Sequence, residues 1–227
     1  MLYIAIILVV LGALWFAYTK SAYYIVTKNQ PWTLLDKGKL GEYLTYRCLR
    51  NEEGNDAKFL FNLYLPKGNG ETTEIDVLMI HPKGLFVFES KNYSGWIFGN
   101  EQQKTWCQTL PKGRGKSQKG TFYNPIMQNR THVKYLREFV DWDLPIHSIV
   151  VFSERCELKK ITLYSNDIHV IKRNYVRSTV ERICENALPI MAEKQIDQLY
   201  EVLLPYAQTS AKMKQKHIDD INRNNNQ

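Results

Sequence analysis

Residues 2–18 form an uninterrupted apolar run, LYIAIILVVLGALWFAY, that contains no charged or strongly polar side chain. A membrane-spanning helix needs about 17 to 25 such residues, so the run reaches the lower limit of that range. Aromatic side chains gather at its end, at Trp15, Phe16 and Tyr18, as amphipathic rings do at the lipid headgroup level. The run therefore predicts a transmembrane helix, which would confine the rest of the chain to one side of a membrane.

The alternative for such a run is a cleaved signal peptide. A signal peptide needs basic residues ahead of the apolar run and small residues at the cleavage site, whereas no Lys or Arg precedes Lys20 and bulky residues surround Tyr18. We therefore expect an uncleaved anchor over residues 1–20. Lysines follow at positions 20, 28, 37 and 39, so the positive-inside rule predicts a single-pass protein with its domain in the cytoplasm.

The composition is that of a globular protein. The chain is 44% hydrophobic, and 30 Lys and Arg against 23 Asp and Glu give a net charge of +7, which excludes disordered and collagen-like classes. The four cysteines lack C-x-x-C spacing, so they favour free thiols in a reducing compartment over a zinc site or a disulfide framework. We expect a juxtamembrane linker over residues 21–35, one folded domain over 36–152, a C-terminal extension with a strand and helices over 153–208, and a disordered polar tail over 209–227.

Hydrophobic periodicity and turn residues predict an α/β order of elements. Asp36 is a helix N-cap, and the helix runs to about Arg50 with Leu40, Leu44 and Cys48 on one face. A second helix begins at the Asn124-Pro125 pair and ends near Val140. Strands are expected at 58–65, 73–80, 85–91, 147–152 and 168–171, and helices continue from there to about residue 208.

The strands at 73–80 and 85–91 flank the turn sequence His81-Pro82-Lys83-Gly84 and so predict a hairpin. If Pro82 and Lys83 are the central turn residues, Asp76 lies opposite Glu89 and Glu74 lies opposite Lys91. Two carboxylates directly opposite one another repel, unless a divalent cation lies between them. The hairpin therefore predicts a metal site. The alternative from the residues alone is a cross-strand ion pair between Glu74 and Lys91 with solvated acids nearby.

Three runs in this order resemble one known family: GKLGEYLTYRCL, TEIDVLMIHPKGLFVFESKNYSGWIFG and YNPIMQN. They are similar to the nuclease-related domain (NERD), a member of the PD-(D/E)XK nuclease superfamily. The resemblance covers about residues 36–152 and implies a restriction-endonuclease-like α/β core in the order helix, three strands, helix, strand. The superfamily usually has Pro before the strand aspartate, and Ile75 stands there in this chain.

The resemblance also implies roles for matching residues. Glu42 is the acid of the first helix, Asp76 and Glu89 are the principal metal ligands, Lys91 is the active-site lysine, and Gln128 reaches the site from the second helix. In the expected mechanism the Ser90 carbonyl joins Asp76 and Glu89 in holding Mg²⁺ or Mn²⁺, and Glu42 also serves the metal, as a direct ligand or through another ligand. From the residues alone, Glu42 lies opposite the Leu40 and Leu44 face as a solvated side chain, and Gln128 can serve as a helix cap. The histidines at 81, 132, 147, 169 and 217 have no metal spacing and are interpreted as structural or surface residues.

A basic stretch gives a second indication of function. From Lys104 to Arg137 there are eight Lys and Arg and no acid, and the KGRGKSQKG portion predicts a flexible, glycine-rich loop. Such a loop suits contacts to phosphates, and Trp106, Phe122 and Tyr123 flank it as stacking candidates. The expected nucleic-acid contacts are Lys112, Arg114, Lys116, Lys119, Arg130 and Lys134. The alternative is that the same loop binds anionic lipid headgroups.

Together these patterns predict a membrane-anchored endo- or exonuclease that hydrolyses phosphodiester bonds, of DNA in preference to RNA, with Mg²⁺ or Mn²⁺. The expected partners are nucleic acid and a lipid bilayer that holds residues 2–18. The alternative from another class is a catalytically inactive, membrane-tethered module that binds nucleic acid, protein or lipid through the same fold.

Overall fold

A five-stranded mixed sheet forms the centre of the computed structural model, which describes residues 2–185, 187–209 and 211–225. Its strand order is β1-β2-β3-β7-β9. The first three strands are antiparallel, and β7 and β9 continue in parallel from β3. All five strands predicted from the sequence are present, as β1 (Lys58–Pro66), β2 (Thr72–His81), β3 (Gly84–Lys91), β7 (Ile146–Phe152) and β9 (Ile168–Lys172).

Helices cover this sheet where the apolar patterns predicted them. In α3 (Lys37–Leu49) the Asp36 side chain accepts from the backbone N–H of Lys39, and in α4 (Pro125–Val140) the Asn124 side chain accepts from that of Ile126. Helix α4 packs on β2, β3 and β7, while α3 contacts β3 and α5 (Val176–Glu185). Helix α6 (Glu193–Ala207) packs on β1. Short 3-10 turns occupy Pro31–Leu35, Arg50–Asn55 and Arg173–Tyr175.

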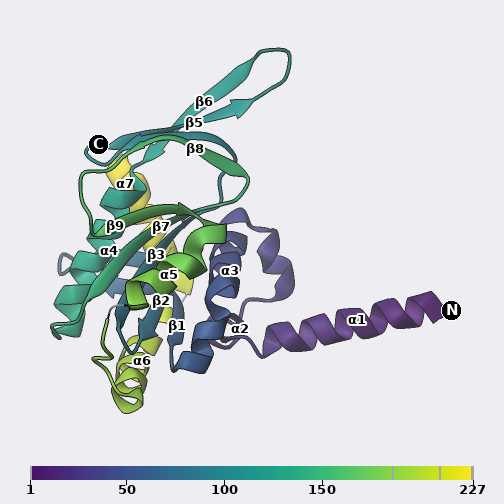
Figure 1. Cartoon of the computed structure of the whole chain (residues 1–227), viewed down its shortest axis with the longest axis vertical. Coiled ribbons are helices and arrows are strands. Elements are labelled where there is room, and N and C mark those ends of the chain that lie inside the picture. The colour runs from purple at the N-terminus through teal and green to yellow at the C-terminus, as the bar shows by residue number, and fades with distance from the viewer. Residues whose placement is uncertain (1, 186, 210, 226–227) are drawn as a thin grey trace.

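A second, four-stranded sheet is formed by three strands between β3 and α4 in the chain and one strand after β7, and the sequence patterns did not predict it. Its strands, in the order β6-β5-β4-β8, are β6 (Ser117–Tyr123), β5 (Thr105–Pro111), β4 (Gly95–Asn100) and β8 (Cys156–Thr162). Most of β6 is exposed, so the apolar alternation that signals a strand is missing. The expected flexible loop is instead a paired β5–β6 hairpin that projects from the body (Figure 1).

The inner face of this second sheet packs against the first. Trp106 is 1% exposed and stacks on Phe152, and Phe122 contacts both rings. Successive side chains of a strand alternate between faces, so these two aromatic residues point inward while their neighbours point outward. Trp106 and Phe122 therefore belong to the core, which corrects their predicted role in stacking on bases. Tyr123, 46% exposed, is the one of the three that reaches solvent.

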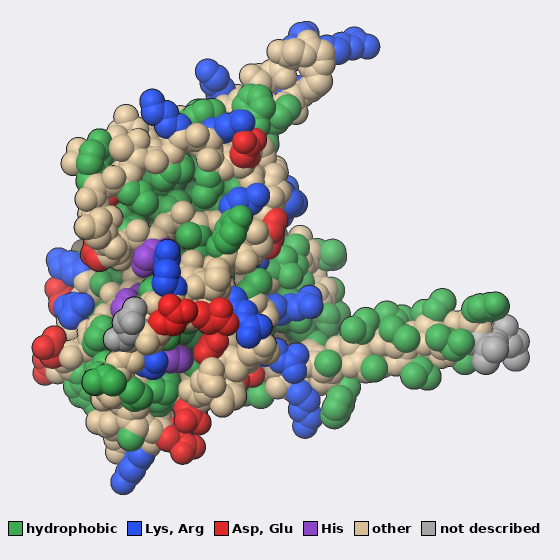
Figure 2. Space-filling view, in the orientation of Figure 1, with side chains coloured by type: hydrophobic (Ala, Val, Ile, Leu, Met, Phe, Trp, Pro, Cys, Tyr) green, Lys and Arg blue, Asp and Glu red, His purple; other side chains and the backbone are tan. Residues whose placement is uncertain are grey.

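The N-terminal segment forms α1 (Leu2–Thr19), which extends away from the body with apolar side chains exposed (Figures 1 and 2). Its last turn belongs to the domain, because Tyr18 is buried and packs against Tyr23, Tyr24 and Tyr43. No helix within the described residues has the length and apolar character that crossing a membrane requires. The predicted transmembrane anchor is therefore wrong, and the predicted single-pass, cytoplasmic topology that rested on it loses its basis.

The terminal extensions are more ordered than their composition suggests. Residues 21–35, expected to be a linker, contain α2 (Ala22–Thr27), which buries Tyr23 and Val26 in the core. The segment expected to be a disordered polar tail contains α7 (Ala211–Asn225). Residue 1 of the predicted anchor and residues 226–227 of the predicted tail lie outside the described residues.

The close contact between Gly99 and Trp106 gives a stability prediction. A Cβ added at Gly99 would lie 2.1 Å from the Trp106 ring, whereas a Cβ at Gly120 of the same sheet meets no heavy atom within 4 Å. We expect Gly99→Ala to lower the free energy of unfolding by about 1 to 3 kcal/mol, as overpacking does. Gly120→Ala is the matched control, and denaturant unfolding of both variants is the measurement. Equal midpoints would contradict the packing described here.

Candidate active site

The β2–β3 hairpin brings the predicted acidic residues together. Its register pairs Val77 with Phe88 and His81 with Gly84, which is the alignment predicted from the turn. In place of a further backbone pair, the Asp76 carboxylate accepts the backbone N–H of Ser90 at 2.8 Å. Asp76 and Glu89 thus lie at the same end of adjacent strands.

Glu89 is the most deeply buried acid of this group. Its side chain is fully shielded from solvent, with Oε1 2.5 Å from Lys91 Nζ and Oε2 3.0 Å from His132 Nε2. Burial by itself raises the pKa of Glu89, but Lys91 and His132 outweigh burial and hold the pKa below its ordinary value. Glu89 is therefore ionised and fixed between two nitrogen groups.

Asp76 has the opposite electrostatic balance. Burial raises its pKa well above the ordinary range, and the negative charges of Glu89 and Glu42 raise it further. Lys91 and the Ser90 N–H act in the other direction without cancelling this effect. Two carboxylates with shifts of opposite sign at one strand end are typical of functional sites.

Lys91 connects the hairpin to α4. Its ammonium donates to Gln128 Oε1 at 3.0 Å and pairs with Glu89. Burial lowers the pKa of Lys91, but Glu89 and Asp76 outweigh that effect and raise it, so the side chain stays charged. The alternative Glu74–Lys91 ion pair is not formed, because Glu74 instead accepts from the Tyr64 hydroxyl at 2.5 Å.

Glu42 corrects the helical face predicted from the sequence. The buried residues of α3 include Gly41, Glu42, Thr45 and Tyr46, a face offset by one position from Leu40 and Leu44. Glu42 is 8% exposed and accepts from Asn62 Nδ2 at 2.9 Å. Burial, partly offset by Asn62, raises the pKa of Glu42 to about 7. It is thus a buried acid on the Asp76 side and not a solvated one.

The sequence patterns did not place His132, Thr73 or Asn62 at this site. His132 contacts Glu89 and, through Nδ1, Thr73 Oγ1 at 2.6 Å. Because His132 lies four residues after Gln128, helical spacing alone could have placed both on one face. Asn62, the single polar residue in the run FLFNLYL, has a left-handed φ of 49°, and strained backbone of this kind gathers at functional sites.

A cavity of about 420 Å³ opens beside these residues. Asp76, Gln128 and His132 form part of its wall, and Lys67, Lys104 and Tyr123 line the rim. His217 of α7 also lines it, contacting Thr72 Oγ1 at 2.9 Å. Its position shows that the histidines at 132 and 217, interpreted from sequence as structural or surface residues, lie at the site.

Of the six predicted nucleic-acid contacts, five are exposed lysine or arginine side chains and one, Arg130, is bound within the protein. Lys112, Arg114, Lys116 and Lys119 are exposed on the projecting β5–β6 hairpin, where Figure 2 shows Lys and Arg side chains at the tip. Lys134 is exposed on α4, with its Nζ 3.9 Å from Glu138 Oε1. Arg130 differs, since its guanidinium is bound by Glu101 and by Ser165 Oγ, so its predicted phosphate contact is replaced by an internal one.

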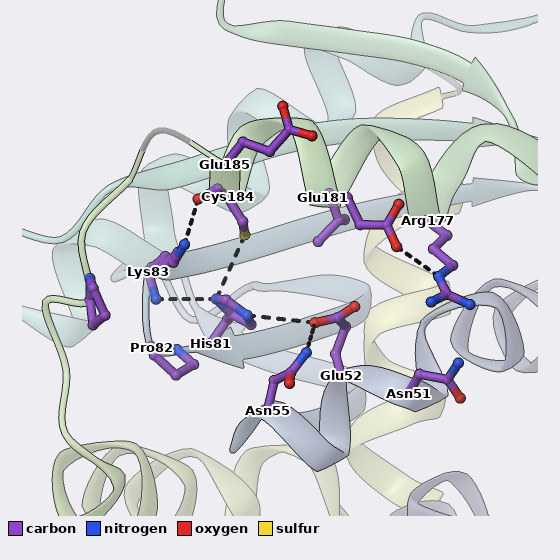
Figure 3. Close-up of a pocket in the computed structure, with 12 residues that line it drawn as sticks. Asn51, Glu52, Asn55, His81, Pro82, Lys83, Arg177, Glu181, Cys184 and Glu185 are labelled. Carbon is purple, nitrogen blue, oxygen red and sulfur yellow. Dashed lines mark hydrogen bonds and ion pairs between the residues drawn. The ribbon is translucent and has the colours of Figure 1, made fainter.

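A larger cavity, about 660 Å³, lies at the turn end of the same hairpin (Figure 3). Three carboxylates line it, those of Glu52, Glu181 and Glu185. Its cations are Lys83, which donates to the Cys184 carbonyl, and Arg177, which pairs with Glu181, so neither is free to hold a phosphate. Burial raises the pKa of the Cys184 thiol there, so a thiolate nucleophile is also disfavoured. The smaller cavity beside Asp76 is therefore the candidate active site.

Comparison with known proteins agrees with this geometry. A family profile described as nuclease-related domain matches residues 37–153, more than half of the chain. The chain belongs to the nuclease-related domain family. An uncharacterized protein from Bacillus anthracis is similar at 30% identity over 195 residues, which are 86% of this chain and 86% of that protein. No solved structure matches the chain. The family carries a nuclease-like function and points to hydrolase activity.

A divalent cation at this site would need oxygen ligands. Across the described ranges no group of three or more His, Cys, Asp and Glu side chains is arranged to hold a metal ion. The ligands that would fit are the two carboxylates of Asp76 and Glu89 with the Ser90 carbonyl. The pKa of Asp76 is raised by burial first and then by the negative charges of Glu89 and Glu42, which a cation would offset. Hard oxygen donors of this kind suit Mg²⁺ or Mn²⁺.

The raised pKa of Glu42 gives a pH prediction. Since the folded-state pKa of about 7 lies above the ordinary 4.5, the folded chain binds this proton more tightly than the unfolded chain does. The stabilisation is complete below pH 4.5 and is lost as the pH rises through 7. We expect Glu42→Gln, which keeps an acceptor for Asn62, to gain stability over wild type across this window, by at most about 3 kcal/mol.

The measurement is denaturant unfolding at several pH values in EDTA, which removes divalent cations. Exposed Glu138 on α4 supplies the matched control, Glu138→Gln, whose difference from wild type should stay flat with pH. A flat difference for Glu42→Gln as well would show that Glu42 is ionised in the folded chain like a surface acid.

Proposed function

We propose that this nuclease-related domain hydrolyses the phosphodiester bonds of nucleic acid, with DNA as the favoured substrate, in a reaction that depends on Mg²⁺ or Mn²⁺. The observation that supports it most is the set of the buried Glu89 and the partly buried Asp76 and Lys91 at one end of a hairpin, next to a cavity that Lys67 and Lys104 also line. The element order α3, β1, β2, β3, α4, β7 supports a restriction-endonuclease-like core with β4, β5 and β6 inserted.

Asp76, Glu89 and the Ser90 carbonyl would hold the cation, with Glu42 close enough to Asp76 to raise its pKa. When bound, such a cation polarises the scissile phosphate and lowers the pKa of a water ligand. Glu89 needs to be ionised for this role, and Lys91 with His132 keeps it so. Glu42 adds negative charge that strengthens the preference of the site for a cation.

Lys91 is the residue that would stabilise the negative charge that develops on the phosphate during cleavage. Its ammonium stays protonated, and Gln128 and Glu89 hold it in one orientation. A fixed cation at this point neutralises negative charge that builds up on the phosphate oxygens or orients the attacking water. His132 acts indirectly: it holds Glu89 through Nε2 and is itself held by Thr73.

The first test is cleavage of labelled DNA and RNA by the full chain with Mg²⁺ or Mn²⁺. We expect Asp76→Asn, Glu89→Gln and Lys91→Met each to abolish measurable cleavage, because each removes a metal ligand or the fixed cation. For His132→Ala we expect a loss of about 10- to 100-fold, the usual effect of removing a group that orients a ligand. Glu138→Gln is the surface control and should cut like wild type.

Cleavage at the wild-type rate by all three hairpin variants would overturn this assignment of the active site. Unfolding midpoints separate lost chemistry from lost structure. Breaking a buried charge pair costs about 3 to 5 kcal/mol, so variants of Glu89 and Lys91 need this check most.

The basic hairpin gives a second test, by affinity against salt concentration. We expect Lys112→Ala, Arg114→Ala and Lys116→Ala combined to weaken DNA binding and to lower the slope of log affinity against log salt by as much as about 3, because each phosphate contact contributes about 0.9 to that slope for duplex DNA. A triple Ala variant of Arg177, Arg182 and Lys194, which are exposed elsewhere, makes the same charge change. An equal slope in both triple variants would contradict a specific role for the hairpin.

A further inference from the structure

The outer face of the second sheet contains a cavity of about 510 Å³ that is separate from the candidate active site. Its floor is a row of side chains directly beside one another across four strands. The register pairs Thr121 with Cys107, Cys107 with Phe98, and Phe98 with Lys160. All four line the cavity, so one sheet face presents an aromatic ring next to a cation.

The sheet cavity is separate from the cavity beside Asp76, but neighbouring residues line the two. Thr105 lines the sheet cavity, and its paired neighbour Tyr123 lines the cavity beside Asp76. Gln103 and Lys104, adjacent in the chain, face the sheet cavity and the active-site cavity respectively. A strand of polymer that leaves the active site past Tyr123 therefore meets the sheet cavity next.

The residues that line the sheet cavity suit a nucleotide. They include no carboxylate, and they provide the ammonium of Lys160, the amide of Gln103, and the rings of Phe98 and Tyr164, while the amide of Asn100 is engaged with Tyr164 and Gln102. Amides pair with base edges and aromatic rings stack on base faces, while a lysine attracts a phosphate. The larger cavity of Figure 3 differs, because three carboxylates line it, and its cations are held internally, Lys83 by the Cys184 carbonyl and Arg177 by Glu181.

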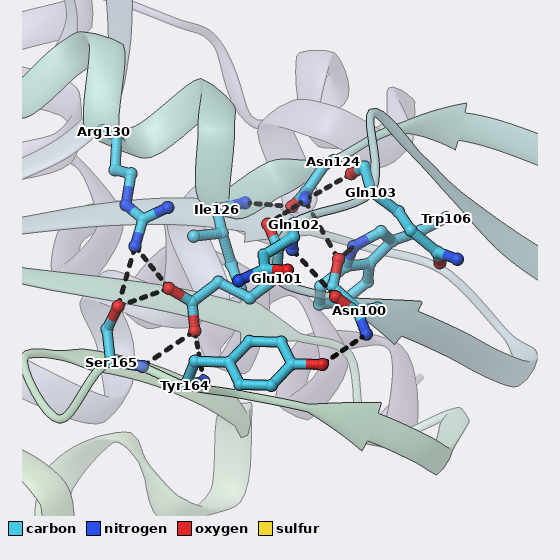
Figure 4. A network of polar contacts seen from close by, with 10 residues as sticks. All are labelled: Asn100, Glu101, Gln102, Gln103, Trp106, Asn124, Ile126, Arg130, Tyr164 and Ser165. Carbon is cyan, nitrogen blue, oxygen red and sulfur yellow. Dashed lines mark hydrogen bonds and ion pairs between the residues drawn. The ribbon is translucent and has the colours of Figure 1, made fainter.

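Tyr164 is held in place although it is 59% exposed. Figure 4 shows Asn100 Nδ2 donating to the Tyr164 hydroxyl, at 3.1 Å, and the Tyr164 backbone N–H donating to Glu101 at 2.5 Å. Glu101 is neutralised by Arg130 on the side away from the ring. The amide of Gln103 points away from this network. An exposed ring already fixed by its hydroxyl loses little freedom when a base stacks on it.

We propose that this cavity is a subsite for single-stranded nucleic acid, in which a base stacks on Tyr164 and a phosphate contacts Lys160. The proposal rests on the proposed function, since it extends the substrate track from the active site. An unpaired strand is required because the faces of paired bases are covered by their neighbours. The subsite gives the enzyme a preference for substrates with a single-stranded segment next to the scissile bond.

The test is fluorescence anisotropy of the full chain with labelled oligo(dT) and oligo(U) of ~12 nucleotides, within the range of known single-strand sites, and with a blunt duplex of equal length. EDTA prevents cleavage. Tyr164→Ala should raise the Kd for single strands about fivefold or more, the effect of losing one stacked base, and leave the Kd for duplex unchanged. Tyr175→Ala, which removes an equally exposed ring elsewhere, should bind like wild type.

Lys160→Ala should lower the salt slope for single strands by about 0.7, whereas Lys159→Ala, at the adjacent residue that pairs with Glu157, should not. The oligo(dT) and oligo(U) arms are compared with oligo(dU), which shares its base with oligo(U) and its sugar with oligo(dT), and so decides which sugar the subsite takes. Equal binding by Tyr164→Ala and Tyr175→Ala in properly folded protein would overturn the subsite, even if Asp76→Asn abolishes cleavage. Selective loss of single-strand binding in a chain that cuts no substrate would support the subsite and overturn the proposed hydrolysis.

Discussion

The buried charge of Glu89 is the constraint on which the rest of the site depends. A carboxylate inside a sheet is strongly unfavourable unless it is paired, and removing one partner of a buried pair costs about 3 to 5 kcal/mol. Lys91 on the same strand and His132 on α4 supply the compensating groups. The contact between Glu89 and His132 therefore fixes α4 against β3. Gln128, one turn before His132 on α4, accepts a hydrogen bond from Lys91 and so also holds its ammonium.

The sequence predicted the hairpin register because strand alternation and turn chemistry are local rules. The pairing of Val77 with Phe88 follows from the turn alone. Glu42 was predicted to be solvated because the buried face of a helix depends on what the helix packs against. Its partner Asn62 lies in β1, which is distant from α3 in the sequence. Arg130 was assigned to phosphate because its partner Glu101 lies 29 residues away in sequence, beyond any local pattern.

The second sheet and the N-terminus show two further limits. Strands β6 and β8 have exposed, polar faces, so hydrophobic periodicity gives no signal for them. The apolar run at residues 2–18 met a composition rule for membrane spans. That rule takes no account of tertiary packing, in which Tyr18 is buried in the domain core against three other tyrosines. Composition gives the number of apolar side chains in a segment, whereas the tertiary structure decides which of them are buried in the protein core.

The side chain of Asn124 joins the second sheet to α4. Its amide donates to the carbonyls of Asn100, Glu101 and Gln103, while its oxygen caps α4. Asn124 thus clamps the segment between β4 and β5 to the start of α4, where the chain returns to the central sheet. The far tip of the β5–β6 hairpin projects away from that junction, and a Cβ added at Gly113 or Gly115 there would meet no heavy atom within 4 Å. A peptide can therefore be grafted at this tip without moving the helix that supports Lys91.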